Sequence, residues 1–194
     1  MACGSFSRYV GAMPAPIPPD RKDWTWVLQH RCPQCGLDVS QLTTDEVADR
    51  AEAAGVEWMQ VLTSNPGVLL RPEPLVWSPL EYGAHVRDVY ALFDARLALM
   101  LVEDEPTFDN WDQDEAAENE DYATQDPEAV ADELLVRSEA IVTRIRGLQI
   151  DQLERLGRRS DGAEFTVTTF LRYFLHDVIH HLWDVTGQQD GVEL

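Results

Sequence analysis

The chain has 194 residues, of which 44% are hydrophobic, a length and composition typical of one globular domain. Its formal net charge of -20 disfavours binding to the phosphate backbone of nucleic acids. No apolar run approaches the roughly 20 residues that a membrane span requires, and the first residues lack the pattern of a secretory signal. We therefore expect a cytoplasmic protein that binds neither nucleic acid nor membrane.

Residues 1–42 are predicted to form an irregular N-terminal arm and a cysteine loop that pack on the body. The sequence Cys32-Pro-Gln-Cys35-Gly is half of a zinc knuckle, because such a turn brings two thiolates to one side. No second pair with this spacing exists, so a closed site would need further ligands, for which His30 and Cys3 are the candidates. The alternative is a pair of reduced cysteines in a loop that packs near the core.

Four long helices are predicted in residues 43–186, and residues 187–194 form a C-terminal tail. Each helix begins at a residue that favours the N-cap position, and the second and third have proline directly after it. The predicted N-caps are Thr43, Ser78, Asp126 and Thr166. No convincing period-2 strand is found, so residues 103–121 are expected to be an acidic surface loop and 157–162 a turn. The fold class is therefore an all-α, antiparallel four-helix bundle.

Histidines in two of these helices suggest a metal site inside the bundle. His176 and His180 are four residues apart on the last helix and therefore share one face. His85 lies in the second turn of the second helix, on a face that otherwise points to the core. Three imidazoles are a usual protein contribution to catalytic zinc, with positions left open for water or substrate. The neighbouring His181 is predicted to point elsewhere, and core histidines bonded to carbonyls are the alternative for all of them.

The segment from Trp77 to Asp88, followed some ninety residues later by His176-x-x-x-His180, resembles the DinB-like metalloenzyme superfamily. The resemblance covers residues 43–186. It implies a four-helix bundle with an up-up-down-down arrangement, and a divalent metal held by His85, His176 and His180. Some members have a carboxylate where this chain has His176. Zinc is the first candidate for the metal, with nickel as an alternative.

Arginine supplies the basic residues almost alone, with Lys22 the single lysine, a composition that suits actinobacteria. Several actinobacterial members of the superfamily use the thiol mycothiol. The resemblance therefore implies a metal-dependent thiol S-transferase, in which a low-molecular-weight thiol is activated and attacks a small electrophile. We expect Asp177 or Asp184 to orient an imidazole, and Trp111 to cover the substrate.

Two other functions use the same ligands. A small metal-dependent hydrolase would activate water in place of the thiol, and Asp88 is the candidate base. A stress-related bundle without turnover would bind the metal to stabilise the fold, with a closed coordination sphere and no adjoining pocket. A helical bundle of this kind can also form a homodimer through an exposed face.

Overall fold

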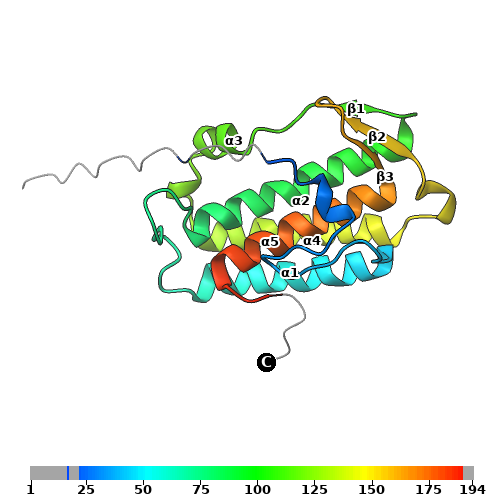
Figure 1. The fold of residues 1–194 in the computed structure, drawn as a ribbon. Coiled ribbons are helices and arrows are strands. Elements are labelled where there is room, and N and C mark those ends of the chain that lie inside the picture. Colours follow the sequence, from blue (N-terminus) through cyan, green and yellow to red (C-terminus); the bar gives the residue numbers. More distant parts are fainter. Residues whose placement is uncertain (1–16, 18–21, 190–194) are drawn as a thin grey trace, which may run out of the picture.

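The computed structural model describes residue 17 and residues 22–189 of the chain. Four long helices form a bundle (Figure 1): α1 (Thr44–Ser64), α2 (Pro79–Val102), α4 (Pro127–Arg146) and α5 (Val167–Thr186). The predicted four-helix bundle is confirmed, and all four predicted N-cap residues occupy the N-cap position. Within the described residues, none of the helices combines the length and apolar character that crossing a membrane requires.

The helices pack in the order α1, α4, α2, α5 around the bundle, so α1 and α2 face each other diagonally. Arg146 at the end of α4 pairs with Asp49 near the start of α1, which makes these helices antiparallel. Arg137 pairs with Asp88 and, further along both helices, Arg144 pairs with Asp94, which makes α2 and α4 parallel. Arg172, early in α5, donates to a carbonyl that directly precedes α1, so α1 and α5 are parallel.

Along the chain the helices therefore run up, down, down and up, which corrects the order up-up-down-down that the family resemblance implied. The physical reason is the connection between α2 and α4. It leaves α2 at one end of the bundle and returns along the outside to the other end before α4 begins (Figure 1). Two consecutive helices can then point the same way.

Smaller elements occupy the segment before α1 and the connections between the long helices. They are η1 (Thr25–Leu28), β1 (Thr107–Phe108), α3 (Gln113–Asn119), η2 (Tyr122–Thr124), η3 (Ile150–Gln152), β2 (Leu156–Arg159) and β3 (Glu164–Thr166). The strands form one sheet in the order β1-β2-β3, with β1 parallel and β3 antiparallel to β2. The predicted loop 103–121 and the predicted turn 157–162 are therefore partly regular. Strands of two to four residues are too short to show an alternating pattern.

Two buried aromatic side chains fix the positions of the helices around the core. The indole nitrogen of Trp58 on α1 donates to the carbonyl of Val178 on α5, with 3.3 Å between the atoms. The hydroxyl of Tyr90 on α2 donates to the carbonyl of Ala51 on α1 at 2.7 Å. Because a buried polar atom is costly when it lacks a partner, these bonds favour one arrangement of α1, α2 and α5.

The segment before α1 lies against the bundle. Val27, Leu37 and Val39 are almost completely buried, and so are Cys32 and Cys35. The segment therefore contributes to the hydrophobic core and brings its cysteines to the surface of α5.

The capping box at the start of α2 should contribute measurably to stability. The Ser78 hydroxyl accepts a hydrogen bond from the Glu81 amide at 3.2 Å and donates to the Glu81 carboxylate at 2.8 Å, in a buried position. We expect Ser78→Ala to lower the free energy of unfolding by about 1 kcal/mol, measured by urea denaturation. The matched control is Ser64→Ala at the exposed end of α1, which should change it by less than about 0.5 kcal/mol. Equal losses would contradict the assignment.

Candidate metal centres

Helix α5 carries two pairs of metal-binding side chains, offset by a single residue. His176 and His180 form one pair, and Asp177 and His181 form the other. Both pairs are four residues apart, so each shares one face of the helix, and the two faces differ by about 100°. Each pair consequently meets a different part of the protein.

The first group consists of His85 from α2 with Asp177 and His181, whose donor atoms all lie within 4.8 Å of one another. Nε2 of His85 and Nε2 of His181 are each 3.4 Å from the same carboxylate oxygen of Asp177. A separation of 3.4 Å is long for an N–H···O hydrogen bond, although the His85 contact still qualifies as one. This separation equals the roughly 3.4 Å expected between two nitrogen or oxygen ligands of a tetrahedral zinc ion. Two imidazoles and one carboxylate are therefore a donor set that fits a divalent metal.

The surroundings hold the two imidazoles of this group in place. Trp111 stacks on His85 with 5.3 Å between ring centroids and 13° between ring planes. The rings of His85 and His181 are perpendicular, with 4.7 Å between their centroids and 89° between their planes. Nδ1 of His181 lies 2.9 Å from a carboxylate oxygen of Asp184, which leaves Nε2 directed at the group. A hydrogen bond from the non-ligating ring nitrogen of a histidine to a carboxylate is a common way to orient a metal ligand.

Burial and charge keep this group in the protonation states that bind cations. Burial lowers the pKa of His85, so its imidazole is neutral at pH 7. Burial would raise the pKa of Asp177, but the hydrogen bond with His85 and the nearby histidines outweigh it and lower the pKa to about 2. The group therefore offers an ionised carboxylate beside a neutral His85, as metal coordination requires.

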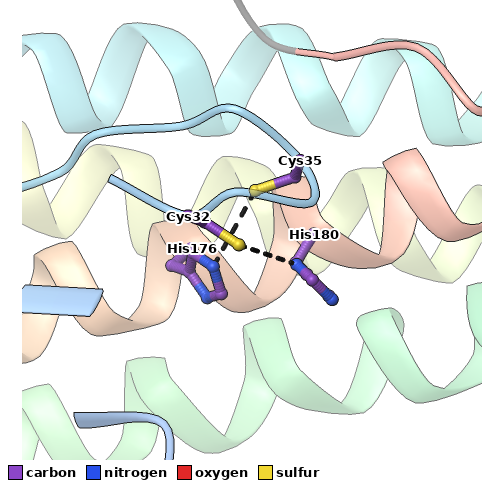
Figure 2. Close-up of side chains that lie close together, drawn as sticks. All are labelled: Cys32, Cys35, His176 and His180. Atoms are coloured by element: carbon purple, nitrogen blue, oxygen red, sulfur yellow. Dashed lines mark hydrogen bonds between the residues drawn. The ribbon is translucent and has the colours of Figure 1, made fainter. Parts of the chain in front are cut away.

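The second group consists of Cys32, Cys35, His176 and His180, all four buried and with donor atoms within 4.8 Å of one another (Figure 2). Sγ of Cys32 lies 3.7 Å from Nδ1 of His180, and Sγ of Cys35 lies 3.8 Å from Nε2 of His176. Burial lowers the pKa of His176 to about 4, with a further contribution from His180. Burial raises the pKa of the Cys35 thiol to about 12, so without a cation nearby it stays protonated.

The structure thus divides the predicted set of three histidines between two groups. His176 and His180 lie together, with ring centroids 5.0 Å apart, but His85 joins Asp177 and His181 instead. Asp177, expected to orient an imidazole, and His181, expected to point elsewhere, are donors of this first group. Their spacing of four residues is the signal that could have identified them, because it is the same as that of His176 and His180.

The cysteines also have different neighbours from those considered in the sequence. They face His176 and His180, whereas His30 is exposed and belongs to neither group of the described residues. Cys3 lies outside the described residues.

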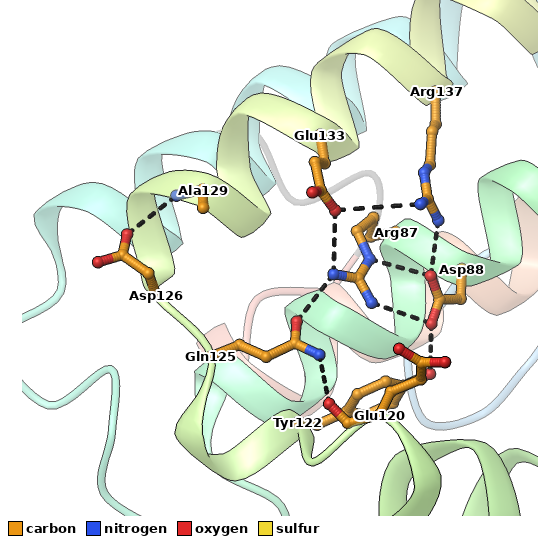
Figure 3. Close-up of polar contacts among 9 residues, drawn as sticks. All are labelled: Arg87, Asp88, Glu120, Tyr122, Gln125, Asp126, Ala129, Glu133 and Arg137. Carbon is orange, nitrogen blue, oxygen red and sulfur yellow. Dashed lines mark hydrogen bonds and ion pairs between the residues drawn. The ribbon is translucent and has the colours of Figure 1, made fainter.

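Asp88, the candidate base, is fully engaged in a polar network between α2, α4 and η2 (Figure 3). Arg87 donates to both of its carboxylate oxygens, and Arg137 and Tyr122 donate to one each, at 2.6 to 3.1 Å. Burial would raise the pKa of Asp88, but the hydrogen bonds from Arg87 and Tyr122 outweigh it and lower the pKa. A carboxylate with four donors and a low pKa is poorly suited to accept a proton, and its position is that of a structural anchor.

A cavity of about 870 Å³ lies beside the first group. Asp177 and His181 form part of its wall, together with His176 and His180. The remaining wall includes aromatic side chains from four parts of the chain: Trp24, Trp77, Tyr82, Trp111 and Tyr173. These aromatic side chains share the wall with many polar and charged ones, among them Lys22, Asp23 and Arg159. The cavity is therefore concave, as small-molecule sites are, but more polar than most of them.

The family model of the DinB superfamily matches residues 57–185, which is more than half of the chain. The chain belongs to the DinB superfamily. Among solved structures, this DinB protein is similar to YfiT from Bacillus subtilis, described as a probable metal-dependent hydrolase with an unusual four-helix bundle topology. The TM-score is 0.68 at 19% identity, covering 74% of this chain and 84% of that one. No curated protein shows a significant match.

The region that the family model matches contains the whole of the first group but only part of the second. All donors of the first group lie within residues 57–185, whereas Cys32 and Cys35 precede the matched region. The cysteine loop is thus outside the part of this DinB protein that the family model covers.

Proposed function

We propose that this DinB protein is a metal-dependent enzyme whose ion is held by His85, Asp177 and His181. The observation that carries the proposal is a group of three donors of which two, Asp177 and His181, lie in the wall of a cavity. Catalytic zinc sites typically use three protein ligands and keep a fourth position for water or substrate. When bound there, a divalent ion supplies a Lewis acid that lowers the pKa of a thiol or water molecule in contact with it.

The first candidate reaction is transfer of a low-molecular-weight thiol of the mycothiol type to a small electrophile. The cavity supports it, because about 870 Å³ is near the upper end of the range for ligand pockets and accommodates two small molecules together. Trp111 stacks on His85 and also lines the cavity, so it would exclude water from the reacting thiol. Tyr82 and Trp77 provide an apolar wall for the electrophile.

Hydrolysis is the second candidate, and the donor set favours it. Two histidines with one carboxylate are the ligands of several zinc hydrolases. The similar fold of YfiT, described as a probable metal-dependent hydrolase, supports this alternative. By contrast, a bundle that binds metal only for stability predicts a closed group without a pocket, and the cavity beside His181 argues against that function for this group.

A paired assay separates the candidates. The protein, loaded in turn with zinc and nickel, is mixed with a bimane electrophile and several low-molecular-weight thiols, and separately with activated ester and amide substrates. Thiol transfer predicts metal-dependent conjugation that saturates with one thiol, with little hydrolysis. The opposite pattern would establish the hydrolase, and absence of both activities in metal-loaded protein would contradict the enzymatic proposal.

Asp184 should tune the metal affinity of this site through His181. We expect Asp184→Asn to weaken binding by about 10- to 100-fold, because the orienting carboxylate on Nδ1 is lost. Competition with a chromophoric chelator measures the change. Asp132→Asn, an exposed position on α4, is the matched control and should leave the affinity unchanged. If both variants bind equally well, Asp184 does not act through the ligand.

A further inference from the structure

The cysteine loop and α5 meet in a group of four donors that the proposed enzymatic function does not use. Cys32 and Cys35 come from the loop after η1, and His176 and His180 project toward them from α5 (Figure 2). The two halves are far apart in the sequence, with a separation of 141 positions from Cys35 to His176. All four side chains are buried, with relative exposures of 0, 0, 4 and 7%.

The distances fit one ion better than they fit hydrogen bonds. The sulfur–nitrogen separations of 3.7 and 3.8 Å are close to the roughly 3.6 Å between sulfur and nitrogen ligands of tetrahedral zinc. A thiol is only a weak hydrogen-bond donor, so two such contacts side by side would stabilise the arrangement little. Two thiolates also neutralise a divalent cation, so the complete site would be uncharged in a buried position.

The backbone of the cysteine loop is shaped to place both sulfur atoms on one side. The amide of Gly36 donates to the carbonyl of Cys32 at 2.9 Å, and the amide of Cys32 donates to the carbonyl of Leu37 at 2.9 Å. Gly36 has a φ of 79°, in the left-handed region that favours glycine. This tight turn, followed by a buried Leu37, is the knuckle expected of a Cys-x-x-Cys zinc ligand pair.

We propose a second metal centre in this protein, in which Cys32, Cys35, His176 and His180 hold a structural zinc ion. Four protein donors complete a tetrahedral coordination sphere and leave no position for substrate, so the centre is structural. Its role is to fasten the segment before α1 onto α5. That segment includes Trp24, whose ring lies 4.9 Å from His180 and which lines the cavity of the first group. The structural ion therefore positions one wall of the proposed active site.

The test is the zinc content of the purified full-length protein, measured by mass spectrometry under reducing conditions. We expect Cys32→Ser/Cys35→Ser to lose one equivalent of zinc relative to wild type, while the control Cys3→Ser loses none. His85→Ala/His181→Ala should retain the equivalent held by the cysteines. The two centres are thereby distinguished, and failure of the proposed active site leaves this proposal standing.

Spectroscopy keeps the proposal testable even where the cysteine variant does not fold. Wild-type protein loaded with cobalt should show a thiolate-to-cobalt charge-transfer band and the intense visible absorption of tetrahedral cobalt. Titration of the thiols with a mercurial reagent should release one equivalent of zinc. A cobalt spectrum without thiolate bands would overturn the proposal, and so would a Cys32–Cys35 disulfide in zinc-containing protein purified without reductant.

Discussion

His85→Ala should abolish metal-dependent turnover while the protein remains folded. His85 is the donor that α2 contributes to the first group. Without it, this group retains only the two ligands of α5. Because changes to outer-shell partners already cost about 10- to 100-fold, loss of a ligand should reduce kcat/KM by more than about a hundredfold. Steady-state kinetics at saturating metal measures the loss, and circular dichroism verifies the helical content.

A second ligand variant and a control variant should be measured beside His85→Ala. Asp177→Asn keeps the size of the side chain but removes its charge, so it should lose activity with less effect on packing. His30→Ala removes an exposed histidine outside both groups and should retain full activity. Wild-type turnover in a folded His85→Ala protein would rule out His85 as a ligand of the catalytic ion.

The Cys32→Ser/Cys35→Ser protein should melt about 10 °C below wild type. An ion present at a thousand times its Kd contributes about 4 kcal/mol to folding. In a chain of this size each kcal/mol corresponds to about 2–4 °C of Tm. Differential scanning calorimetry measures the shift. Trypsin should also cleave faster after Arg31, an exposed residue of the cysteine loop, because the loop is no longer fastened to α5.

The decrease in Tm caused by loss of the ion must be separated from the decrease caused by placing serine in a buried position. Wild-type protein refolded without metal should therefore melt like the double variant, and added zinc should restore only the wild type. Cys3→Ser is the matched control for the loss of a thiol. Identical melting of zinc-loaded and zinc-free wild type would contradict a stabilising role for the ion.

The helices of this protein could be predicted because local chemistry determines where they begin. Thr43 and Ser78 form capping boxes with the residues three positions later, and Asp126 accepts two amide hydrogen bonds at the start of α4. Gly187 ends α5 in the left-handed conformation, as expected from its place in the sequence. These signals are complete within a few residues, so they needed no knowledge of the tertiary structure.

The sheet and the division of donors could not be predicted in the same way. β1 pairs with β2 across about fifty residues, as Thr107 with Arg158, and neither strand is long enough to reveal itself alone. On α5, spacing identifies His176 with His180 and Asp177 with His181 equally well. Which pair faces His85 depends on the rotation of α5 in the bundle, and the hydrophobic pattern of α5 did not determine this rotation to within one residue.

The one-residue offset between the donor pairs of α5 has a consequence for how the protein acquires its metals. His176 and His180 line the same cavity as Asp177 and His181, so access does not distinguish the two groups. The group of the cysteine loop offers four protein ligands, two of them thiolates, and should therefore exchange its ion slowly. The group of His85, Asp177 and His181 offers only three protein ligands, so its ion should exchange more readily in the native state. One helix would thus carry a permanent ion next to a replaceable one, and the metal available in the cell would determine the identity of the second alone.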